Sequence, residues 1–225
     1  DGEQNVEIID DIYLKYDDQL RLELKNTIDS CLSKDDLKKL SKKIKDIEKK
    51  ITLNHAQISK LIIEKNKNIK VDLIGFHGQT ILHRPENGYS IQIGDSRLLA
   101  ELTNTNVISN FRENDILNGG QGAPLTPLYH KALMKHLKIT DPRLIVNIGG
   151  ITNVTYLNKG NIFSTDIGPG NCLIDQWIKK NFSRDFDKGG KISLEGKTNQ
   201  NLADNFLNKL KKNKNISYDT SDFDL

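Results

Sequence analysis

Residues 110–125 bring one carboxylate and one guanidinium to the entrance of a glycine-rich turn. Arg112 and Asp115 lie three positions apart, and the run Gly-Gly-Gln-Gly-Ala-Pro follows them. The backbone N–H groups of such a turn can face a ligand, and an isolated acid beside it can act as a general base. An ordinary surface turn with a solvated Asp is the alternative, and this segment alone does not separate the two interpretations.

A second polar cluster, Gly-Phe-His-Gly-Gln-Thr, occupies residues 75–80 at the end of an apolar run. His77, Gln79 and Thr80 can donate and accept hydrogen bonds, and such groups suit a hydroxyl-rich ligand. A histidine that is satisfied within a tight turn is the alternative. The spacing of the histidines gives no metal-ligand pattern, so we discount a zinc site.

Two further glycine turns could bind phosphate. Residues 147–150 (NIGG) end a strand-like run, and a turn without side chains lets backbone N–H groups approach a phosphate closely. A plain β-hairpin is the alternative. Residues 165–171 (TDIGPGN) place two glycines before a predicted helix, whose N-terminus attracts anions, and Asp166 could hold hydrated magnesium. No Walker A pattern is present, so a nucleotide would bind through another architecture.

The elements that would position these groups alternate between strands and helices after residue 70. The patterns predict strands over residues 71–76, 90–93, 106–111 and 144–148, and helices over 96–102, 128–137, 171–182 and 199–211. This mixture indicates α/β layering, with a second unit beginning near residue 141. Ligands bind at the carboxyl ends of strands in open α/β sheets, which is where the strand over 106–111 would deliver Arg112 and Asp115.

The first 65 residues show a different pattern of apolar and charged residues. Residues 6–16 are rich in β-branched and aromatic residues and predict a strand, so the chain looks cut at its start. From Ser33 onward, apolar residues at helical spacing predict one long amphipathic helix, broken near Thr52. The lysines between them indicate a solvated face; a nucleic-acid stripe or a coiled-coil arm is less favoured.

Composition limits the class of protein. The sequence has 33 basic and 30 acidic residues, a net charge of +3, which is weak support for nucleic-acid binding. Cys31 and Cys172 lie outside any metal-ligand spacing, so we expect reduced thiols. No apolar run approaches the ~20 residues of a membrane helix. We therefore expect a soluble, cytoplasmic protein with neither nucleic acid nor membrane as a partner.

Five segments, in this order and spacing, resemble the anhydro-N-acetylmuramic acid kinase family: GFHGQTILHRP, IQIGD, FRENDILNGGQGAPL, NIGGITNVT and TDIGPGNCLIDQW. The resemblance implies an α/β, two-domain actin-like (ribonuclease H-like) sugar kinase fold. It places the sugar side, the catalytic base and the Lys-rich helix in residues 1–140, and the start of a second domain with a phosphate loop in residues 141–225. It also implies an ATP- and Mg²⁺-dependent conversion of 1,6-anhydro-N-acetylmuramic acid and water into N-acetylmuramic acid 6-phosphate and ADP, in peptidoglycan recycling.

The same resemblance implies roles for individual residues. It makes Asp115 and Arg112 catalytic, and Asp166 the ligand of Mg²⁺. The implied sugar-binding residues are His77, Gln79, Thr80, Gln92 and Asp95, and the implied nucleotide phosphate-binding residues are Asn147, Gly149, Gly150, Gly168, Gly170 and Asn171. On charge alone, Arg84 and Arg112 are candidates for the lactyl carboxylate. The expected partners are the amino sugar and ATP, and a homodimer is left open.

Two family segments have no counterpart in this sequence: an N-terminal Gly-Thr-Ser-x-Asp-Gly phosphate loop and a C-terminal Gly-rich adenosine segment. We therefore expect a fold that is incomplete at both ends, apolar surface left exposed on its first sheet, and no turnover by this chain alone. A non-catalytic sugar- or nucleotide-binding remnant of the kinase fold is the alternative function, and Asp115 favours the enzyme.

Overall fold

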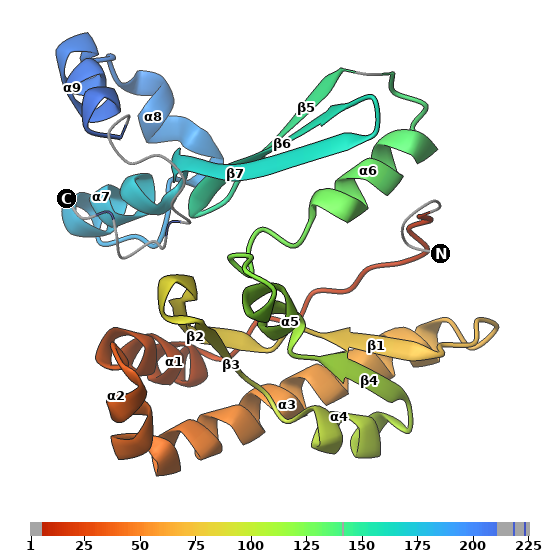
Figure 1. The fold of residues 1–225 in the computed structure, drawn as a ribbon. Helices are drawn as coiled ribbons and strands as arrows, with labels where there is room; N and C mark the ends of the chain where they lie inside the picture. The colour runs from red at the N-terminus through yellow and green to blue at the C-terminus, as the bar shows by residue number, and fades with distance from the viewer. Residues whose placement is uncertain (1–5, 141, 211–217, 219–222, 224–225) are drawn as a thin grey trace. The chain divides into compact units, whose positions relative to one another are not determined.

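The computed structural model describes residues 6–140, 142–210, 218 and 223, and Figure 1 shows their helices and strands. Contacts group residues 7–122 into one compact unit and residues 123–225, with 1–6, into another. The α/β class predicted from the sequence is confirmed. Helix α6 (Pro127–His136) contacts the strands of the second unit, so the contacts divide the chain before this helix. The domain boundary near residue 140 stays a prediction.

The unit of residues 7–122 contains two small sheets and five α-helices. Its helices are α1 (Asp18–Ser30), α2 (Lys34–Lys39), α3 (Ser41–Lys65), α4 (Ser96–Thr103) and α5 (Phe111–Leu117), and its strands are β1 (Leu73–Phe76), β2 (Gln79–Arg84), β3 (Tyr89–Ile93) and β4 (Asn106–Ser109). Strand β1 pairs in parallel with β4, and β2 pairs antiparallel with β3. The 3₁₀ turn η1 (Pro85–Asn87) joins the antiparallel pair.

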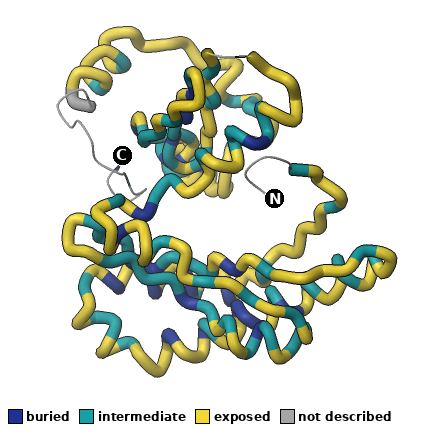
Figure 2. The backbone as a smooth tube through the Cα atoms, turned by 45° about the vertical axis from the view of Figure 1, so that its right-hand side comes forward, coloured by how far each residue is buried: buried dark blue, intermediate teal, exposed yellow. Residues whose placement is uncertain are grey.

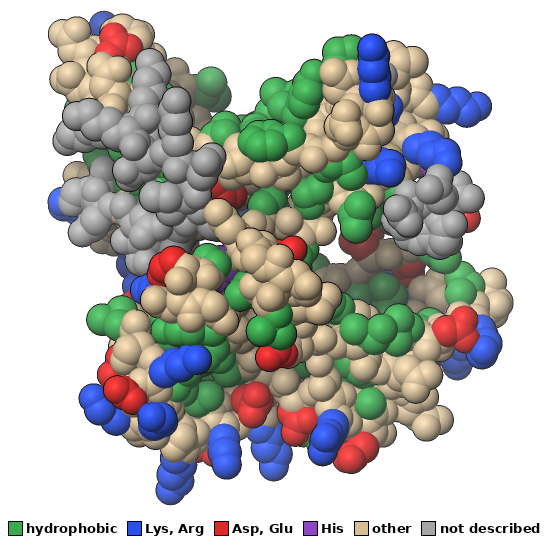
Figure 3. All heavy atoms as spheres, viewed as in Figure 1, with side chains coloured by type: hydrophobic (Ala, Val, Ile, Leu, Met, Phe, Trp, Pro, Cys, Tyr) green, Lys and Arg blue, Asp and Glu red, His purple; other side chains and the backbone are tan. Residues whose placement is uncertain are grey.

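The core of this unit lies where α3 packs against α1 and α4. Its buried members are Leu20, Leu24, Ile44, Ile47, Ile51, Ala56, Phe76, Ile81, Ile93 and Leu99. Figure 2 marks such buried positions in dark blue, recurring along the helices and strands. Lysines between the core positions of α3 are exposed, as the helical spacing predicted, and Figure 3 shows Lys and Arg mixed with Asp and Glu on this outer side.

Two predictions for the first 65 residues are wrong. Residues 6–16 pair with no described strand, and Tyr13 is 84% exposed; β-branched composition favours a strand only where a partner supplies hydrogen bonds. The single long helix is divided at Leu40, which ends α2 and precedes α3. Thr52 does not break α3: it lies inside the helix, with its hydroxyl donating to the Glu48 carbonyl one turn earlier (2.7 Å). Helix α1 was not predicted.

The strands that lead to the site are shorter than the sequence suggested. Strand β1 starts at Leu73, which is 49% exposed, and Ile108 of β4 is 50% exposed, so neither strand is fully buried. Strand β4 ends at Ser109 because Asn110 has a φ of 62°, in the left-handed region. Residues 110 and 111 are therefore not strand, and α5 carries Arg112 and Asp115.

His55 of α3 sits between two aromatic side chains of the core. Its Nε2 lies 2.9 Å from the Tyr16 hydroxyl, and its ring centroid lies 5.0 Å from that of Phe76. Burial lowers the pKa of His55 below its ordinary value, because the charged imidazolium loses solvation. Folding therefore favours the neutral ring.

We expect the melting temperature to fall as the pH is lowered from 7.5 to 5.5. The unfolded chain takes up a proton near the ordinary imidazole pKa of about 6.5, whereas the folded chain resists it, so stability present above that pH is lost below it. His55→Gln keeps an acceptor for the Tyr16 hydroxyl and removes the titration. Its melting temperature should vary less over this range than that of the wild type; an equal fall in both would assign the effect to other groups.

The second unit is a three-stranded antiparallel sheet with helices beside it. After α6 come β5 (Arg143–Ile148), β6 (Ile151–Asn158), β7 (Asn161–Pro169), α7 (Cys172–Phe182), η2 (Lys188–Gly190), α8 (Lys191–Glu195) and α9 (Gln200–Leu210). The strand order is β5-β6-β7. The strand–turn–strand prediction around residue 149 is confirmed. The four predicted helices match α4, α6, α7 and α9 within a residue or two. Lys211, the last residue of the predicted fourth helix, lies outside the described residues.

The two faces of this sheet differ. On one face, His130 Nδ1 of α6 lies 2.8 Å from the Thr155 hydroxyl, with which it shares a hydrogen bond, and Thr155 and Leu157 are buried. Opposite them, cross-strand neighbours Leu144, Tyr156 and Phe163 are 59%, 40% and 60% exposed. Figure 3 shows hydrophobic side chains gathered over this sheet. The described residues therefore leave one apolar face of the sheet open.

Other expectations concern thiols and membranes. Cys31 and Cys172 are free and buried, and burial raises the pKa of both thiols. Among the described residues, no helix is both long enough and apolar enough to cross a membrane.

Candidate active site

The parallel pairing of β1 and β4 brings two of the singled-out segments to one edge. Phe76 is aligned with Ser109 at the carboxyl ends of these strands. His77 and Asn110 come next, and α5 begins one residue later. The histidine segment therefore lies beside the Arg112 segment, at the edge where α/β sheets bind ligands.

Arg112 is held by two neutral acceptors. Its Nε donates to His77 Nε2 (3.1 Å), and its Nη1 donates to the Gly122 carbonyl (3.0 Å). Burial lowers the pKa of Arg112, since the guanidinium loses solvation. No described carboxylate forms an ion pair with it. A partly desolvated cation without a counter-ion is a suitable place for an anionic group of a ligand.

Asp115 is fixed by the glycine turn that the sequence placed beside it. The N–H of Gly122 donates to Asp115 Oδ2 (2.6 Å). Gly120 packs directly against the carboxylate, since a Cβ built there would lie 2.2 Å from Oδ2. Asp115 itself is exposed, and its Oδ1 accepts no hydrogen bond from a described residue. One oxygen is thus anchored and the other is available to a water molecule.

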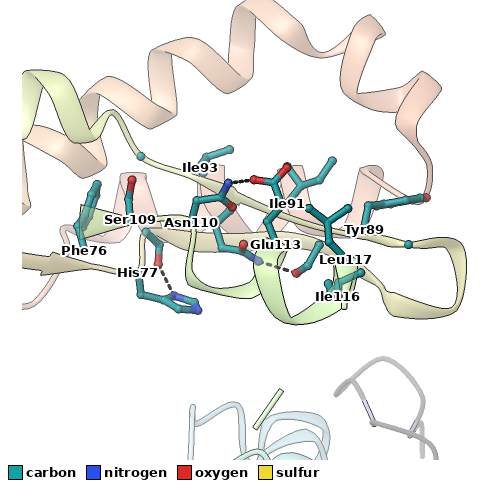
Figure 4. A pocket seen from close by; sticks show the side chains of 15 residues that line it. Phe76, His77, Tyr89, Ile91, Ile93, Ser109, Asn110, Glu113, Ile116 and Leu117 are labelled. Carbon is teal, nitrogen blue, oxygen red and sulfur yellow. Dashed lines mark hydrogen bonds between the residues drawn. The ribbon is translucent and has the colours of Figure 1, made fainter. Parts of the chain in front are cut away.

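A pocket of about 360 Å³ opens between β3 and α5 (Figure 4). Its polar lining residues are His77, Tyr89, Ser90, Gln92, Ser109, Asn110 and Glu113. Asn110 Nδ2 donates to Glu113 Oε2 at the start of α5, and Figure 4 draws this bond among the lining side chains. Among the described lining side chains, Glu113 alone is a carboxylate, and His77 accepts from Arg112 through an unprotonated Nε2. The pocket therefore suits uncharged groups that donate hydrogen bonds.

Gln92, one of the lining residues, carries an unused acceptor. Its Nε2 donates to the hydroxyls of Ser90 (2.7 Å) and Thr80 (3.2 Å). Its Oε1 is buried, with no partner among the described residues. A buried acceptor without a donor is costly, so a ligand O–H or N–H that reached it would be favoured.

The structure does not gather all the predicted sugar-binding residues. Gln92 and Thr80 meet, and His77 lines the pocket, but Gln79 donates to the Thr80 carbonyl and does not line it. The Asp95 carboxylate caps α4 by accepting from the N–H groups of residues 97 and 98. Asp115 also lies outside this lining, because α5 presents Glu113, Ile116 and Leu117 to it.

The sequence analysis missed several polar lining residues: Tyr89, Ser90, Asn110 and Glu113. Each lies inside or beside a quoted motif. Alternation along the segment of residues 89–93, and the helical spacing of residues 113, 116 and 117, were the signals that could have found them.

In the second unit, the two glycine segments meet. The carbonyl of Gly149 accepts from the N–H of Asn171 (2.7 Å), and that of Gly150 accepts from the N–H of Gly170 (2.8 Å) and Cys172 (3.3 Å). A Cβ at Gly170 would lie 2.2 Å from the Gly149 oxygen, so only glycine fits there. Gly168 has a φ of 145°, which also favours glycine.

Asp166 lies in a row of oxygen-bearing side chains across this sheet. Asn153 of β6 is aligned with Asn147 of β5 and with Asp166 of β7. Asn153 Oδ1 is buried without a partner among the described residues, and the sequence analysis did not single it out. Asp166 Oδ2 accepts from the N–H of Tyr218 (2.9 Å). Carboxylate and amide oxygens fit Mg²⁺, although no group of three or more His, Cys, Asp or Glu side chains with metal geometry occurs within the described part.

Comparison with known proteins decides the family. The family profile described as anhydro-N-acetylmuramic acid kinase matches residues 2–213. The chain belongs to this family. The actin-like sugar kinase fold expected from the sequence is the fold of anhydro-N-acetylmuramic acid kinases.

Curated anhydro-N-acetylmuramic acid kinases show the same relationship. The chain is 47% identical over 232 residues to the protein of Pelagibacter ubique, covering 100% of the chain and 61% of the relative. It is 41% identical to that of Rhizobium etli, covering 93% of the chain and 58% of the relative. For Brucella canis the identity is 38%, covering 99% and 62%. The chain thus spans about three-fifths of the length of these relatives.

Proposed function

We propose that this chain carries the sugar side and part of the phosphate side of an ATP-dependent anhydro-N-acetylmuramic acid kinase. The reaction converts 1,6-anhydro-N-acetylmuramic acid, water and ATP into N-acetylmuramic acid 6-phosphate and ADP, in peptidoglycan recycling in the cytoplasm. One observation carries the proposal: Asp115 accepts a hydrogen bond from the Gly122 N–H, and Arg112 donates one to the Gly122 carbonyl. A carboxylate and an uncompensated guanidinium are therefore fixed on one helix without neutralising each other. The names of the curated relatives support it.

The proposed step uses Asp115 as a general base. Asp115 Oδ1 takes a proton from water while the water oxygen bonds to the anomeric carbon. The bond between that carbon and the bridging oxygen breaks, and this oxygen, still bonded to C6, takes the γ-phosphoryl group from ATP as ADP leaves. Arg112 stabilises negative charge on the phosphoryl group or on the lactyl carboxylate. Inversion at the anomeric carbon follows, since water must approach opposite the bridge.

The pocket beside α5 is proposed to hold the uncharged part of the sugar. Gln92 Oε1 and the Glu113 carboxylate are acceptors for hydroxyl or acetamido N–H groups. Thr80 orients Gln92. A carboxylate would be repelled by Glu113, so the lactyl group belongs nearer Arg112. Arg84 is the weaker candidate, since its Nη1 donates to the His83 carbonyl (2.8 Å) and it does not line the pocket.

The phosphate side is proposed to lie at the meeting of the two glycine segments. Nucleotide phosphates would approach the backbone around Gly149, Gly150 and Gly168, with the Asn171 side chain beside them. Mg²⁺ would be held by Asp166, with Asn153 Oδ1 nearby, and would neutralise phosphate charge. Few protein ligands are needed, because Mg²⁺ usually keeps several waters.

Asp166→Asn should raise the magnesium concentration needed for half-maximal activity. The amide keeps an oxygen acceptor for the Tyr218 N–H and removes one negative charge from the proposed ion site. The measurement is the initial rate against Mg²⁺ concentration at fixed ATP. An unchanged magnesium dependence would assign Asp166 to holding the segment at Tyr218.

The test of the function is a product analysis in ¹⁸O-water. The full-length protein is incubated with ATP, Mg²⁺ and 1,6-anhydro-N-acetylmuramic acid, and the product is analysed by mass spectrometry. We expect a 6-phosphate that carries the label on the anomeric hydroxyl and none in the phosphate. Label in the phosphate, or sugar binding without any phosphorylation, would contradict the proposal.

A further inference from the structure

We propose that His77 is a positioning residue, whose unprotonated Nε2 holds the Arg112 guanidinium in its working orientation. The sequence analysis gave His77 a direct contact with the sugar. The inference rests on the proposed function only for the part that Arg112 plays in the reaction. The hydrogen bonds that carry it belong to the protein alone.

Backbone geometry fixes the tautomer of His77. Its Nδ1 lies 2.9 Å from the carbonyl oxygen of Gly78, which can only accept, so Nδ1 carries the proton. The position of that carbonyl depends on glycine: Gly78 has a φ of 68°, and a Cβ there would lie 2.5 Å from the Ile93 oxygen. Nε2 of the neutral ring therefore has a free lone pair directed to Arg112 Nε, 3.1 Å away.

The two acceptors of Arg112 fix the plane of its guanidinium. His77 takes the Nε–H and the Gly122 carbonyl takes an Nη1–H, so rotation about the last side-chain bonds would break one of the two. An unrestrained Arg side chain loses rotamer entropy when a ligand fixes it. Ordering it before the substrate arrives removes part of that cost.

A neutral imidazole orients the Arg112 guanidinium without cancelling its positive charge. A carboxylate in place of His77 would orient the guanidinium equally well but would form an ion pair and weaken its attraction for a ligand anion. Both ring nitrogens of His77 are already used, so a hydrogen bond from the sugar would have to displace either Gly78 or Arg112. Figure 4 shows the His77 ring with its hydrogen bond to the Gly78 carbonyl at the edge of the pocket.

Two substitutions separate the two bonds of His77. In His77→Gln, Oε1 is as many bonds from Cα as Nε2 is, so the acceptor for Arg112 is kept and the bond to Gly78 is lost. In His77→Asn, Nδ2 takes the place of Nδ1, so the bond to Gly78 is kept and the acceptor for Arg112 is lost. His136→Asn, on the exposed end of α6, is the matched control.

The first measurement is the ¹H–¹⁵N NMR signal of the Arg112 Nε–H group, recorded without ligands. We expect a signal that exchanges slowly with water in the wild type, in His77→Gln and in His136→Asn, and its loss in His77→Asn. The second is steady-state kinetics of the full-length protein: His77→Asn should lower kcat by about tenfold or more, with a smaller change in the sugar KM, and His77→Gln should restore most of kcat.

The outcomes are distinguishable. An unchanged Arg112 Nε–H signal in His77→Asn overturns the inference. A rise in the sugar KM in His77→Gln and in His77→Asn, with the Arg112 signal intact, also overturns it and would make His77 a sugar contact. If the amide spectrum shows that His77→Asn is unfolded, loss of the signal in His77→Gln still overturns it. If the signals behave as expected but no sugar is phosphorylated, the proposed function fails and the positioning of Arg112 stands.

Discussion

Asp115→Asn is expected to lower turnover by about 10²–10⁴-fold, the usual contribution of a positioned general base. The substitution keeps an oxygen that can accept from the Gly122 N–H, and it keeps the side-chain volume against Gly120. The glycine turn should therefore stay in place. What is lost is the ability to take a proton from water, so kcat falls while the dissociation constant of the sugar changes little.

The matched control is Glu113→Gln, which removes the carboxylate two residues earlier on the same helix. Glu113 lines the pocket beside α5 and Asp115 does not, so the control should change the sugar KM and leave kcat within about tenfold. Both variants are compared in the full-length protein by kcat, sugar KM and direct sugar titration. A loss below tenfold for Asp115→Asn, or an equal loss in both, would remove Asp115 from the role of base.

Local periodicity predicted the elements whose residues are fixed by near neighbours in the sequence. Helices α4 and α7 have apolar stripes at helical spacing, and each was found within a residue or two of its expected bounds. The hairpin at Gly149 followed from a glycine pair between apolar runs. The segments around His77 and Arg112 meet because β1 and β4 are parallel, a pairing that the sequence analysis did not specify.

The failures occurred where hydrophobic periodicity does not carry the deciding information. The strand over 6–16 required a partner strand, which the described residues do not supply. The strand predicted over 106–111 ends at residue 109, because the backbone of Asn110 is left-handed, and no apolar pattern reveals this. Asn153 was missed because its part in the site follows from the burial of its Oδ1 without a partner among the described residues, which depends on the packing around it. Asp95, which the family resemblance assigned to the sugar, also caps α4, and its part in sugar binding stays a prediction.

The glycines at the proposed phosphate site should divide into two kinds when a side chain is added. At Gly149 a Cβ would have its nearest neighbour, the Ile151 oxygen, at 3.6 Å, an ordinary contact. At Gly170 the Cβ would lie 2.2 Å from the Gly149 oxygen, a backbone atom that cannot move without disturbing the hydrogen bonds of residues 170–172. The first position has room for a side chain in the absence of ligand, and the second has none.

Gly149→Ala and Gly149→Val should therefore leave the melting temperature nearly unchanged and weaken nucleotide binding by about tenfold or more, or ~1.4 kcal/mol, because the added carbons occupy the approach of a phosphate to the backbone. Sugar binding should change much less.

Gly170→Ala, in contrast, should destabilise the folded protein by about 1–3 kcal/mol, the usual cost of overpacking a site that cannot relax. It should also lose nucleotide affinity, because the turn at Gly149 must shift. Thermal unfolding and separate titrations with ATP and with the sugar distinguish the two kinds of effect. Equal losses of ATP and sugar affinity in Gly149→Val would mean that this turn is structural. A Gly170→Ala variant as stable as the wild type would show that the two glycine segments are packed less tightly than their hydrogen bonds indicate.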